Sequence, residues 1–120
     1  MVALKVYQYP RCGTCRKALK YLEEKEIPFA DQNIVESPPS REELAEMVRK
    51  SGLPVKKFFN TSGKKYRELG LKDRLKEMDD EEMLDLLASD GMLIKRPLVT
   101  DGEKVTIGFK EDTFDQTWAQ

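Results

Sequence analysis

Apolar residues near the start of the chain change their spacing from one segment to the next. Residues 4–9 (LKVYQY) are rich in β-branched and aromatic side chains, which is typical of a short strand. Residues 29–35 indicate a second strand. Between them, apolar positions recur at i, i+3, i+4 and i+7, on one face of an amphipathic helix: Cys15, Ala18, Leu19 and Leu22. A strand, a helix and a strand of these lengths predict a βαβ crossover, so the two strands should pair in parallel.

The middle of the chain has a helical pattern. Ser40 and Glu43 have the spacing of a capping box and predict the start of one helix. Residues 53–75 indicate short helical pieces, whose aromatic side chains we interpret as core. Asp79 or Asp80 should cap a further helix. This part of the chain therefore contributes helices and no strand.

The last part of the chain returns to strands. Residues 98–100 and 104–109 predict a β-hairpin, with Asp101 and Gly102 as a favoured two-residue turn. A short helix through Phe114 should follow. The complete order is β-α-β, several helices, then β-β-α. This order predicts an α/β fold with a mixed sheet flanked by helices.

Length and charge restrict the class of protein. With 120 residues, the chain should form a single domain over residues 1–120. It has 21 basic and 22 acidic residues, a balance that argues against tight, direct binding of nucleic acid. No apolar run approaches the roughly 20 residues needed to cross a bilayer, so no membrane association is expected. Residues 1–5 lead into the first strand without a signal pattern, which predicts a cytoplasmic location.

Two cysteines stand where the first strand ends and the first helix begins. Cys12 and Cys15 are the chain's only cysteines, within the segment Tyr9-Pro10-Arg11-Cys12-Gly13-Thr14-Cys15-Arg16. A helix N-terminus has unpaired N–H groups and a partial positive charge, and both favour an anion. If Cys12 lies near the N-cap, this field and the two arginines should lower the pKa of its thiol. Cys15 is close enough in the chain to close a reversible disulfide with Cys12.

A cysteine pair at this spacing can also be structural, metal-binding or incidental. A structural disulfide between these positions would close so small a loop that it would remove little chain entropy. A zinc site would need more ligands, and the chain contains no histidine and no third cysteine. Two incidental cysteines are the remaining alternative. A redox-active pair is favoured, because a cysteine pair beside a strand–helix unit is typical of thioredoxin-like proteins. We therefore expect no bound metal.

Four segments resemble the arsenate reductase (ArsC) and Spx family of thioredoxin-fold proteins, in the family's order and spacing. The resemblance implies a four-stranded mixed sheet flanked by helices, with a helical subdomain inserted at about residues 37–90. It covers nearly the full length of the chain. The matching segments are residues 9–17 (YPRCGTCRK), 36–40 (ESPPS), 66–71 (YRELGL) and 95–99 (KRPLV).

The resemblance also implies roles for particular residues. Cys12 would be the nucleophile, and Pro97 would take the cis form opposite the cysteines. Arg96, which spacing alone would describe as a solvated charge, would bind an oxyanion beside the thiol. Arg11, Gly13, Thr14 and Asn60 complete the candidate binding residues, with Pro97.

The chain also departs from the family's arsenate reductases, which use three arginines around arsenate. Asn60 stands at the first of these positions, and Gly108-Phe109-Lys110 lies near the third, so only Arg96 clearly remains. Loss of two guanidinium groups should weaken arsenate binding. Those reductases also lack a cysteine at the position of Cys15, which could resolve an intermediate within this chain.

Two functions follow from the resemblance. The first is a thiol–disulfide oxidoreductase that acts on an oxidised substrate or an oxyanion such as arsenate, with Cys12 as nucleophile, Cys15 as resolving thiol and Arg96 as anion partner. It would need no cofactor other than an external thiol reductant such as thioredoxin, or glutaredoxin with glutathione. The second is an Spx-like redox-sensing regulator that binds the C-terminal domain of the RNA polymerase α-subunit. The acidic residues 111–118 lack the basic tail typical of that branch.

Overall fold

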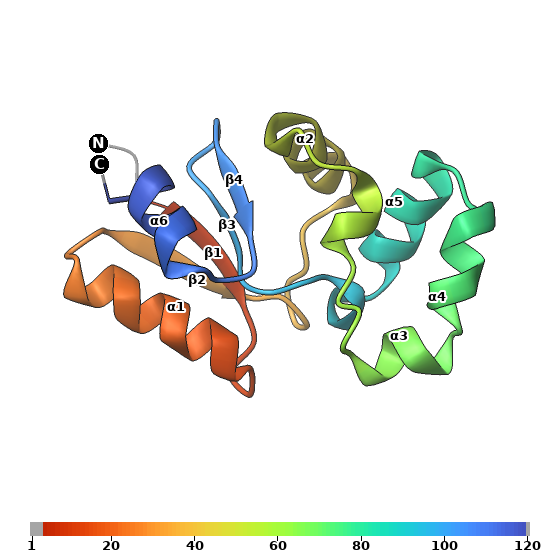
Figure 1. The fold of residues 1–120 in the computed structure, drawn as a ribbon, viewed down its shortest axis with the longest axis horizontal. Helices are drawn as coiled ribbons and strands as arrows, with labels where there is room; N and C mark the ends of the chain where they lie inside the picture. The colour runs from red at the N-terminus through yellow and green to blue at the C-terminus, as the bar shows by residue number, and fades with distance from the viewer. Residues whose placement is uncertain (1–3, 120) are drawn as a thin grey trace.

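The protein's computed structural model describes residues 4–119, and its elements follow the order predicted from the sequence (Figure 1). The strands are β1 (Leu4–Gln8), β2 (Phe29–Asn33), β3 (Leu98–Thr100) and β4 (Val105–Ile107). The α-helices are α1 (Gly13–Glu24), α2 (Arg41–Ser51), α3 (Lys64–Glu68), α4 (Leu71–Arg74), α5 (Asp80–Ser89) and α6 (Glu111–Thr117). Within residues 4–119 there are also three short 3-10 segments: η1 (Val55–Phe58), η2 (Leu75–Glu77) and η3 (Gly91–Leu93).

The four strands form one mixed sheet in the order β2-β1-β3-β4. Strands β1 and β2 pair in parallel over their whole length, from Leu4 opposite Phe29 to Gln8 opposite Asn33. Strand β3 pairs antiparallel with both β1 and β4. The α/β fold class, the parallel βαβ unit and the C-terminal hairpin are therefore confirmed. The helices between β2 and β3, from α2 to η3, occupy residues 41–93. They fill most of the predicted insertion at about residues 37–90 and extend just beyond it.

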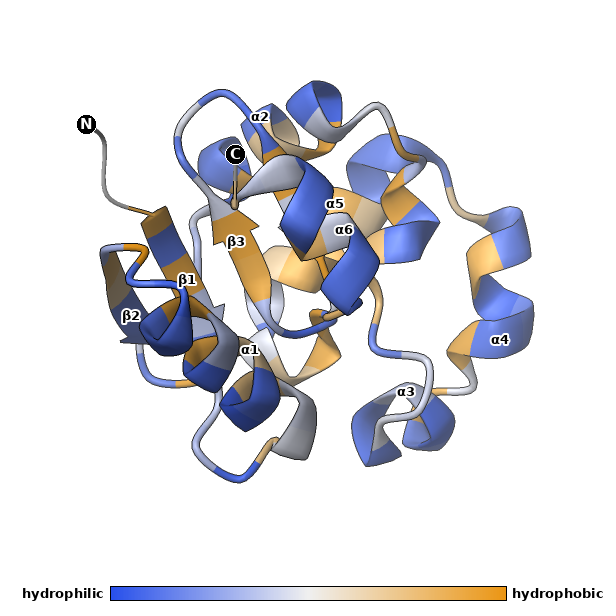
Figure 2. Cartoon of the chain, turned by 60° about the vertical axis from the view of Figure 1, so that its left-hand side comes forward, coloured by the Kyte–Doolittle hydropathy of each residue, from blue (hydrophilic) through white to orange (hydrophobic). Residues whose placement is uncertain are grey.

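Helices pack on both faces of the sheet. Because successive residues of a strand point to opposite faces, each strand contributes side chains to both. Val6 of β1 and Val99 of β3 pack with α1 and α6 in one cluster of buried residues. Their neighbours Tyr7 and Leu98 pack on the other face, in a cluster built mainly by the helices from α2 to α5. In Figure 2, β3 is largely hydrophobic, whereas α1 and α6 show mainly hydrophilic residues to the viewer. Among the described residues, no helix is long and apolar enough to cross a membrane.

Local polar contacts start and end several elements. The predicted capping box of Ser40 and Glu43 is present at α2, and Asp79 forms a second capping box with Glu82 at α5. Strand β2 ends at Asn33, earlier than predicted, because the side-chain Oδ1 of Asn33 accepts hydrogen bonds from the backbone N–H groups of Val35 and Glu36. Side chains of this kind compete with the ladder for backbone donors.

The predicted two-residue hairpin turn is wrong. Thr100 pairs with Val105, which leaves a four-residue loop at residues 101–104. The carboxylate of Asp101 accepts the backbone N–H groups of Glu103 and Lys104, at 2.9 and 2.8 Å. These two bonds hold a wider loop than the Asp-Gly pair alone would form.

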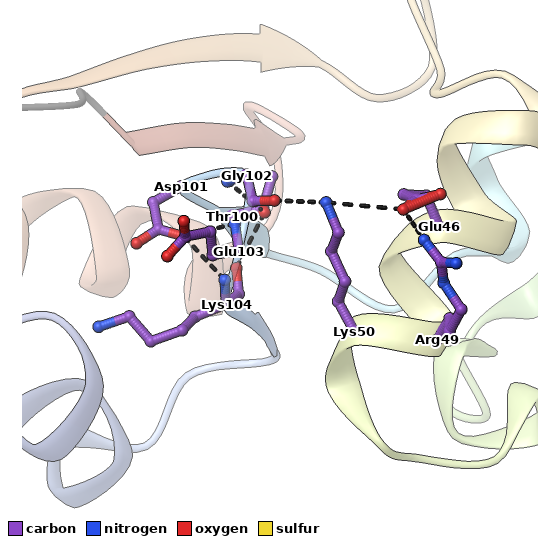
Figure 3. A network of polar contacts seen from close by, with 8 residues as sticks. All are labelled: Glu46, Arg49, Lys50, Thr100, Asp101, Gly102, Glu103 and Lys104. Carbon is purple, nitrogen blue, oxygen red and sulfur yellow. Dashed lines mark hydrogen bonds and ion pairs between the residues drawn. The ribbon is translucent and has the colours of Figure 1, made fainter.

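A polar network connects this loop to α2 (Figure 3). Lys50 of α2 donates its Nζ to the backbone oxygen of Gly102, and Nζ also lies 3.7 Å from Oε1 of Glu46. Arg49 pairs with the same glutamate. Exposed pairs of this kind contribute little to stability, typically about 0–1 kcal/mol. The network therefore aligns α2 with the hairpin and adds little to the buried contacts between them.

Candidate functional site

Cys12 caps the N-terminus of α1, which meets the condition on which its lowered pKa was expected. Its Sγ accepts the backbone N–H of Cys15 at 3.3 Å, so the sulfur satisfies one of the helix's unpaired donors. The backbone N–H of Cys12 donates to the oxygen of Tyr9 at 2.9 Å, which holds the turn that precedes the helix. Both cysteines are free thiols, with Cys12 half-buried and Cys15 fully buried.

The two thiols have opposite pKa shifts. Partial burial acts to raise the pKa of Cys12, but contacts with the side chain and N–H of Cys15 and the charge of Arg96 outweigh it and lower this pKa. Burial, together with the contact with Cys12, raises the pKa of Cys15 to about 12. Cys12 is therefore the first of the pair to form a thiolate, the form that acts as a nucleophile.

Arg96 lies near the Cys12 thiol and over an aromatic ring. Its guanidinium carbon is 5.2 Å from the centroid of the Tyr9 ring, and Nη1 is 3.6 Å from Sδ of Met92. A cation over an aromatic face is attracted by the ring quadrupole. Arg96 is thus half-buried at the site. It is not the solvated surface charge that spacing alone suggested.

Asn60 reaches the site through a short antiparallel pairing outside the sheet. Phe59 and Ile94 form an isolated β-bridge, the N–H of Asn60 donates to Leu93 at 2.8 Å, and the N–H of Lys95 donates to Phe58 at 2.7 Å. This pairing connects the helical segment to the chain that enters β3. It therefore places a residue from position 60 next to residues from position 95 onward.

These residues surround an open pocket of about 290 Å³. Four of the predicted site residues line it: Cys12, Thr14, Asn60 and Arg96. Gly108, which the resemblance placed near the third arginine position, also lines it. The pocket therefore brings together segments from the first helix, the helical insertion and the hairpin.

Other predicted site residues do not line this pocket. Arg11 and Gly13 are exposed on the α1 turn, and Arg16 donates its Nε to the backbone oxygen of Pro10 at 3.1 Å. Pro97 is buried and follows a cis peptide bond with Arg96, the form that the resemblance implied. The backbone oxygen of Pro97 accepts the N–H of Gly108 at 2.9 Å.

The sequence interpretation assigned no role to two lysines of the pocket, Lys95 and Lys110. Gly108 brings the first of them close, because a Cβ at this position would lie 3.1 Å from Cε of Lys95. Gly108 also has φ +75°, which L side chains rarely adopt. The available sequence signal was Gly108, two residues before Lys110. Its contact with Lys95 depends on the hairpin, which folds back on the segment before Pro97.

No metal-binding arrangement is evident in residues 4–119. They contain no group of three or more His, Cys, Asp or Glu side chains that could hold a metal ion.

The fold and the site define a thioredoxin-like α/β protein with a Cys-Gly-Thr-Cys motif at the N-terminus of its first helix. More specifically, the chain belongs to the ArsC family, whose model matches residues 7–117.

Three relatives illustrate these similarities. The chain is 63% identical over 118 residues to the uncharacterized protein YusI of Bacillus subtilis (strain 168), covering 98% of this chain and 100% of YusI. It is 32% identical over 103 residues to the global transcriptional regulator Spx of Streptococcus pyogenes serotype M1, covering 86% of this chain and 75% of Spx. The crystal structure of a possible arsenate reductase from Streptococcus mutans UA159 superposes with a TM-score of 0.87 at 42% identity, covering 96% and 99% of the two chains.

Proposed function

We propose that the protein is a thiol–disulfide oxidoreductase of the ArsC family, with Cys12 as nucleophile and Cys15 as resolving thiol. The observation that carries the proposal is the N-cap position of Cys12, whose Sγ accepts the N–H of Cys15 at 3.3 Å. The lowered pKa of Cys12 and the raised pKa of Cys15 support this division of roles. A nucleophile should ionise readily, and a buried partner should stay protonated until the first step is complete.

The first step is attack on an oxidised substrate. The Cys12 thiolate attacks one sulfur of a mixed disulfide R–S–S–R′, forming a bond to that sulfur and releasing R′S⁻. Arg96 lies in the same pocket and would offset negative charge on the substrate.

The second step uses Cys15. Its thiol loses a proton to solvent and attacks Sγ of Cys12, which releases the second thiolate, RS⁻, and leaves a Cys12–Cys15 disulfide. The substrate disulfide is thus reduced to two thiolates, and the two cysteine thiols are oxidised to a disulfide. An external thiol reductant, thioredoxin or glutaredoxin with glutathione, returns the pair to the dithiol. This chemistry suits the cytoplasm, the location expected from the sequence.

Arsenate is a second substrate class for the same site, supported by the ArsC family match and the Streptococcus mutans neighbour. Cys12 would displace an oxygen of arsenate as water, and attack by Cys15 would release arsenite, with two electrons passing from the thiols to arsenic. The pocket holds one guanidinium, Arg96, and two lysines. Lysine binds an anion as a point charge without arginine's paired donors. We therefore rank disulfides ahead of arsenate.

Turnover with purified, reduced protein tests this proposal. The assay supplies a peptide–glutathione mixed disulfide, or arsenate, and follows NADPH oxidation through the thioredoxin system and, separately, the glutathione and glutaredoxin system. We expect activity in wild type, none in Cys12→Ser, and a trapped mixed disulfide on Cys12 in Cys15→Ser, visible by intact mass. A wild-type rate equal to that of Cys12→Ser with every substrate and reductant would reject the proposed oxidoreductase activity.

A redox-sensing regulator is the second candidate function, favoured by the 32% identity to Spx over 103 residues. In this case the Cys12–Cys15 disulfide would be a switch that changes binding to the C-terminal domain of the RNA polymerase α-subunit. Its test is capture of that domain by the oxidised and reduced protein. Redox-dependent capture without turnover would support the regulator, and turnover without capture would support the enzyme.

A further inference from the structure

A second, larger hollow of about 500 Å³ lies in the helical segment. Figure 1 shows the helices α3 and α4, which border this part of the molecule, at the end away from α1 and α6. Four lysines line the hollow: Lys56 and Lys57 from η1, Lys72 from α4 and Lys76 from η2. Of the described residues that line it, none is acidic. We call this hollow the lysine groove.

The lysines are a local excess of positive charge. The whole chain has 21 basic and 22 acidic residues, so an average surface would mix the two signs. Within residues 4–119, Lys56, Lys57 and Lys72 take part in no ion pair, and Lys76 lies 4.0 Å from a largely exposed carboxylate, that of Asp73. Their charges are therefore available to a ligand.

The interior of the lysine groove is apolar. Leu75, Met78 and Met83 line it together with the lysines. Met83 and Leu75 are nearly buried, and Met78 is half-buried. Methionine side chains are flexible and polarizable, so they fit apolar groups of different shapes. A ligand that fills the groove would thus pair an apolar side chain with these residues and acidic groups with the lysines around them.

The lysine groove and the thiol pocket share one loop. Asn60 and Ser62 line the pocket that contains Cys12, whereas Thr61 between them lines the lysine groove. The two hollows therefore lie next to each other on either side of residues 60–62. A polypeptide that extended from the groove past residues 60–62 would reach the pocket that contains Cys12.

We propose that the lysine groove docks an acidic segment of a partner protein, anchored by an apolar side chain on the methionines. The positive charge of the lysines favours a negatively charged partner. The apolar interior favours a polypeptide, because a polypeptide can combine acidic and apolar side chains. Nucleic acid fits less well, because a phosphate backbone uses the lysines and leaves the methionines uncovered. The docking goes beyond thiol chemistry and does not require it.

A random peptide library displayed on phage tests the proposal with reduced wild-type protein as bait. We expect selected peptides that combine Asp or Glu with Leu, Met or Phe. Each selected peptide is then labelled, and its affinity is measured by fluorescence anisotropy. Replacement of its acidic residues by amides, or of its apolar residue by Ser, should weaken binding.

Variants of the protein locate the binding site. The double variant Lys72→Glu/Lys76→Glu should weaken binding by about tenfold or more, because it removes attraction and adds repulsion. Lys17→Glu/Lys20→Glu on α1 makes the same change in net charge outside the groove and should leave affinity unchanged. Cys12→Ser/Cys15→Ser should also bind as wild type, which separates docking from the proposed redox function. Circular dichroism confirms that each variant is folded.

Three results would overturn the proposal. The first is a library selection without an acidic, apolar motif. The second is equal loss of affinity in the groove variant and the α1 variant. The third is tighter binding of a labelled single-stranded oligonucleotide than of any selected peptide, with the same dependence on Lys72 and Lys76, which would assign the groove to nucleic acid.

Discussion

The guanidinium of Arg96 lies over the ring of Tyr9, 5.2 Å from its centroid, and Tyr9 also accepts the N–H of Cys12 through its backbone oxygen. One residue therefore contacts both the thiol's segment and the cation beside it. The backbone contact survives any substitution at position 9, whereas the ring contact does not. Tyr9 is thus a positioning residue for Arg96.

We expect Tyr9→Leu to lower kcat/KM for a mixed disulfide that bears carboxylates, by roughly twofold to fivefold, because a partly exposed cation–π contact contributes about 0.5–1 kcal/mol. Tyr9→Phe retains a ring and should keep the wild-type value. An uncharged small disulfide should respond to neither change. Equal losses in the Leu and Phe variants would contradict this role of the ring.

The second prediction concerns the pH dependence of Cys12. In a Cys15→Ser background, ultraviolet absorbance and the rate of alkylation should report one thiolate, which forms as pH rises through the pKa of Cys12. The midpoint should fall below about 8.5, the value of a free cysteine, because the serine hydroxyl can donate to the thiolate in place of the Cys15 thiol. The backbone N–H of residue 15 and the charge of Arg96 also favour the anion. Arg96→Gln should move the midpoint to higher pH, and Arg96→Lys should move it less. A midpoint at or above about 8.5 in the Cys15→Ser protein would argue against an activated nucleophile.

The third prediction concerns the choice between disulfide and oxyanion. Asn60→Arg adds a second guanidinium to the pocket that contains Cys12 and Arg96, so affinity for arsenate should rise by about tenfold, as a charge-assisted hydrogen bond of about 1.5–3 kcal/mol allows. Thr61→Arg is the matched control, because Thr61 lines the lysine groove and not this pocket. Saturation kinetics with arsenate give the apparent arsenate affinity of each variant. Similar affinities in the two variants would show that the position of the added guanidinium is irrelevant.

The fourth prediction concerns Gly91, at the start of η3. A Cβ at this position would lie 1.9 Å from the backbone oxygen of Ile34, which cannot move as a side chain could. Gly91→Ala should therefore lower the free energy of unfolding by about 1–3 kcal/mol or more. Gly13→Ala is the control, because a Cβ there meets no atom within 4 Å and the first turn of α1 accepts alanine. Urea denaturation followed by circular dichroism measures both, and a Gly91→Ala protein as stable as Gly13→Ala would disprove the close contact.

Local chemistry explains why most elements were predictable. The capping box of Ser40 and Glu43 and the N-cap position of Cys12 depend on residues within one helical turn. The hairpin was predicted as well, but not its loop, because the two-residue prediction ignored the side chain of Asp101 and its two N–H partners. A turn is decided by all the donors and acceptors near it, and the Asp-Gly pair is only part of them.

The sequence by itself determined the fold class, the strand order along the chain and the place of the cysteine pair, because each depends on periodicity or on neighbours in the chain. The family resemblance implied that Arg96 and Asn60 belong to the site, but only the tertiary structure showed how they and Lys95 come to surround Cys12. Asn60 arrives through the pairing of Phe59 with Ile94, and Lys95 lies against Gly108 because the hairpin folds back on Pro97. Such contacts join segments from 11 to 35 positions apart in the chain, well beyond one helical turn, and local periodicity carries no information about them.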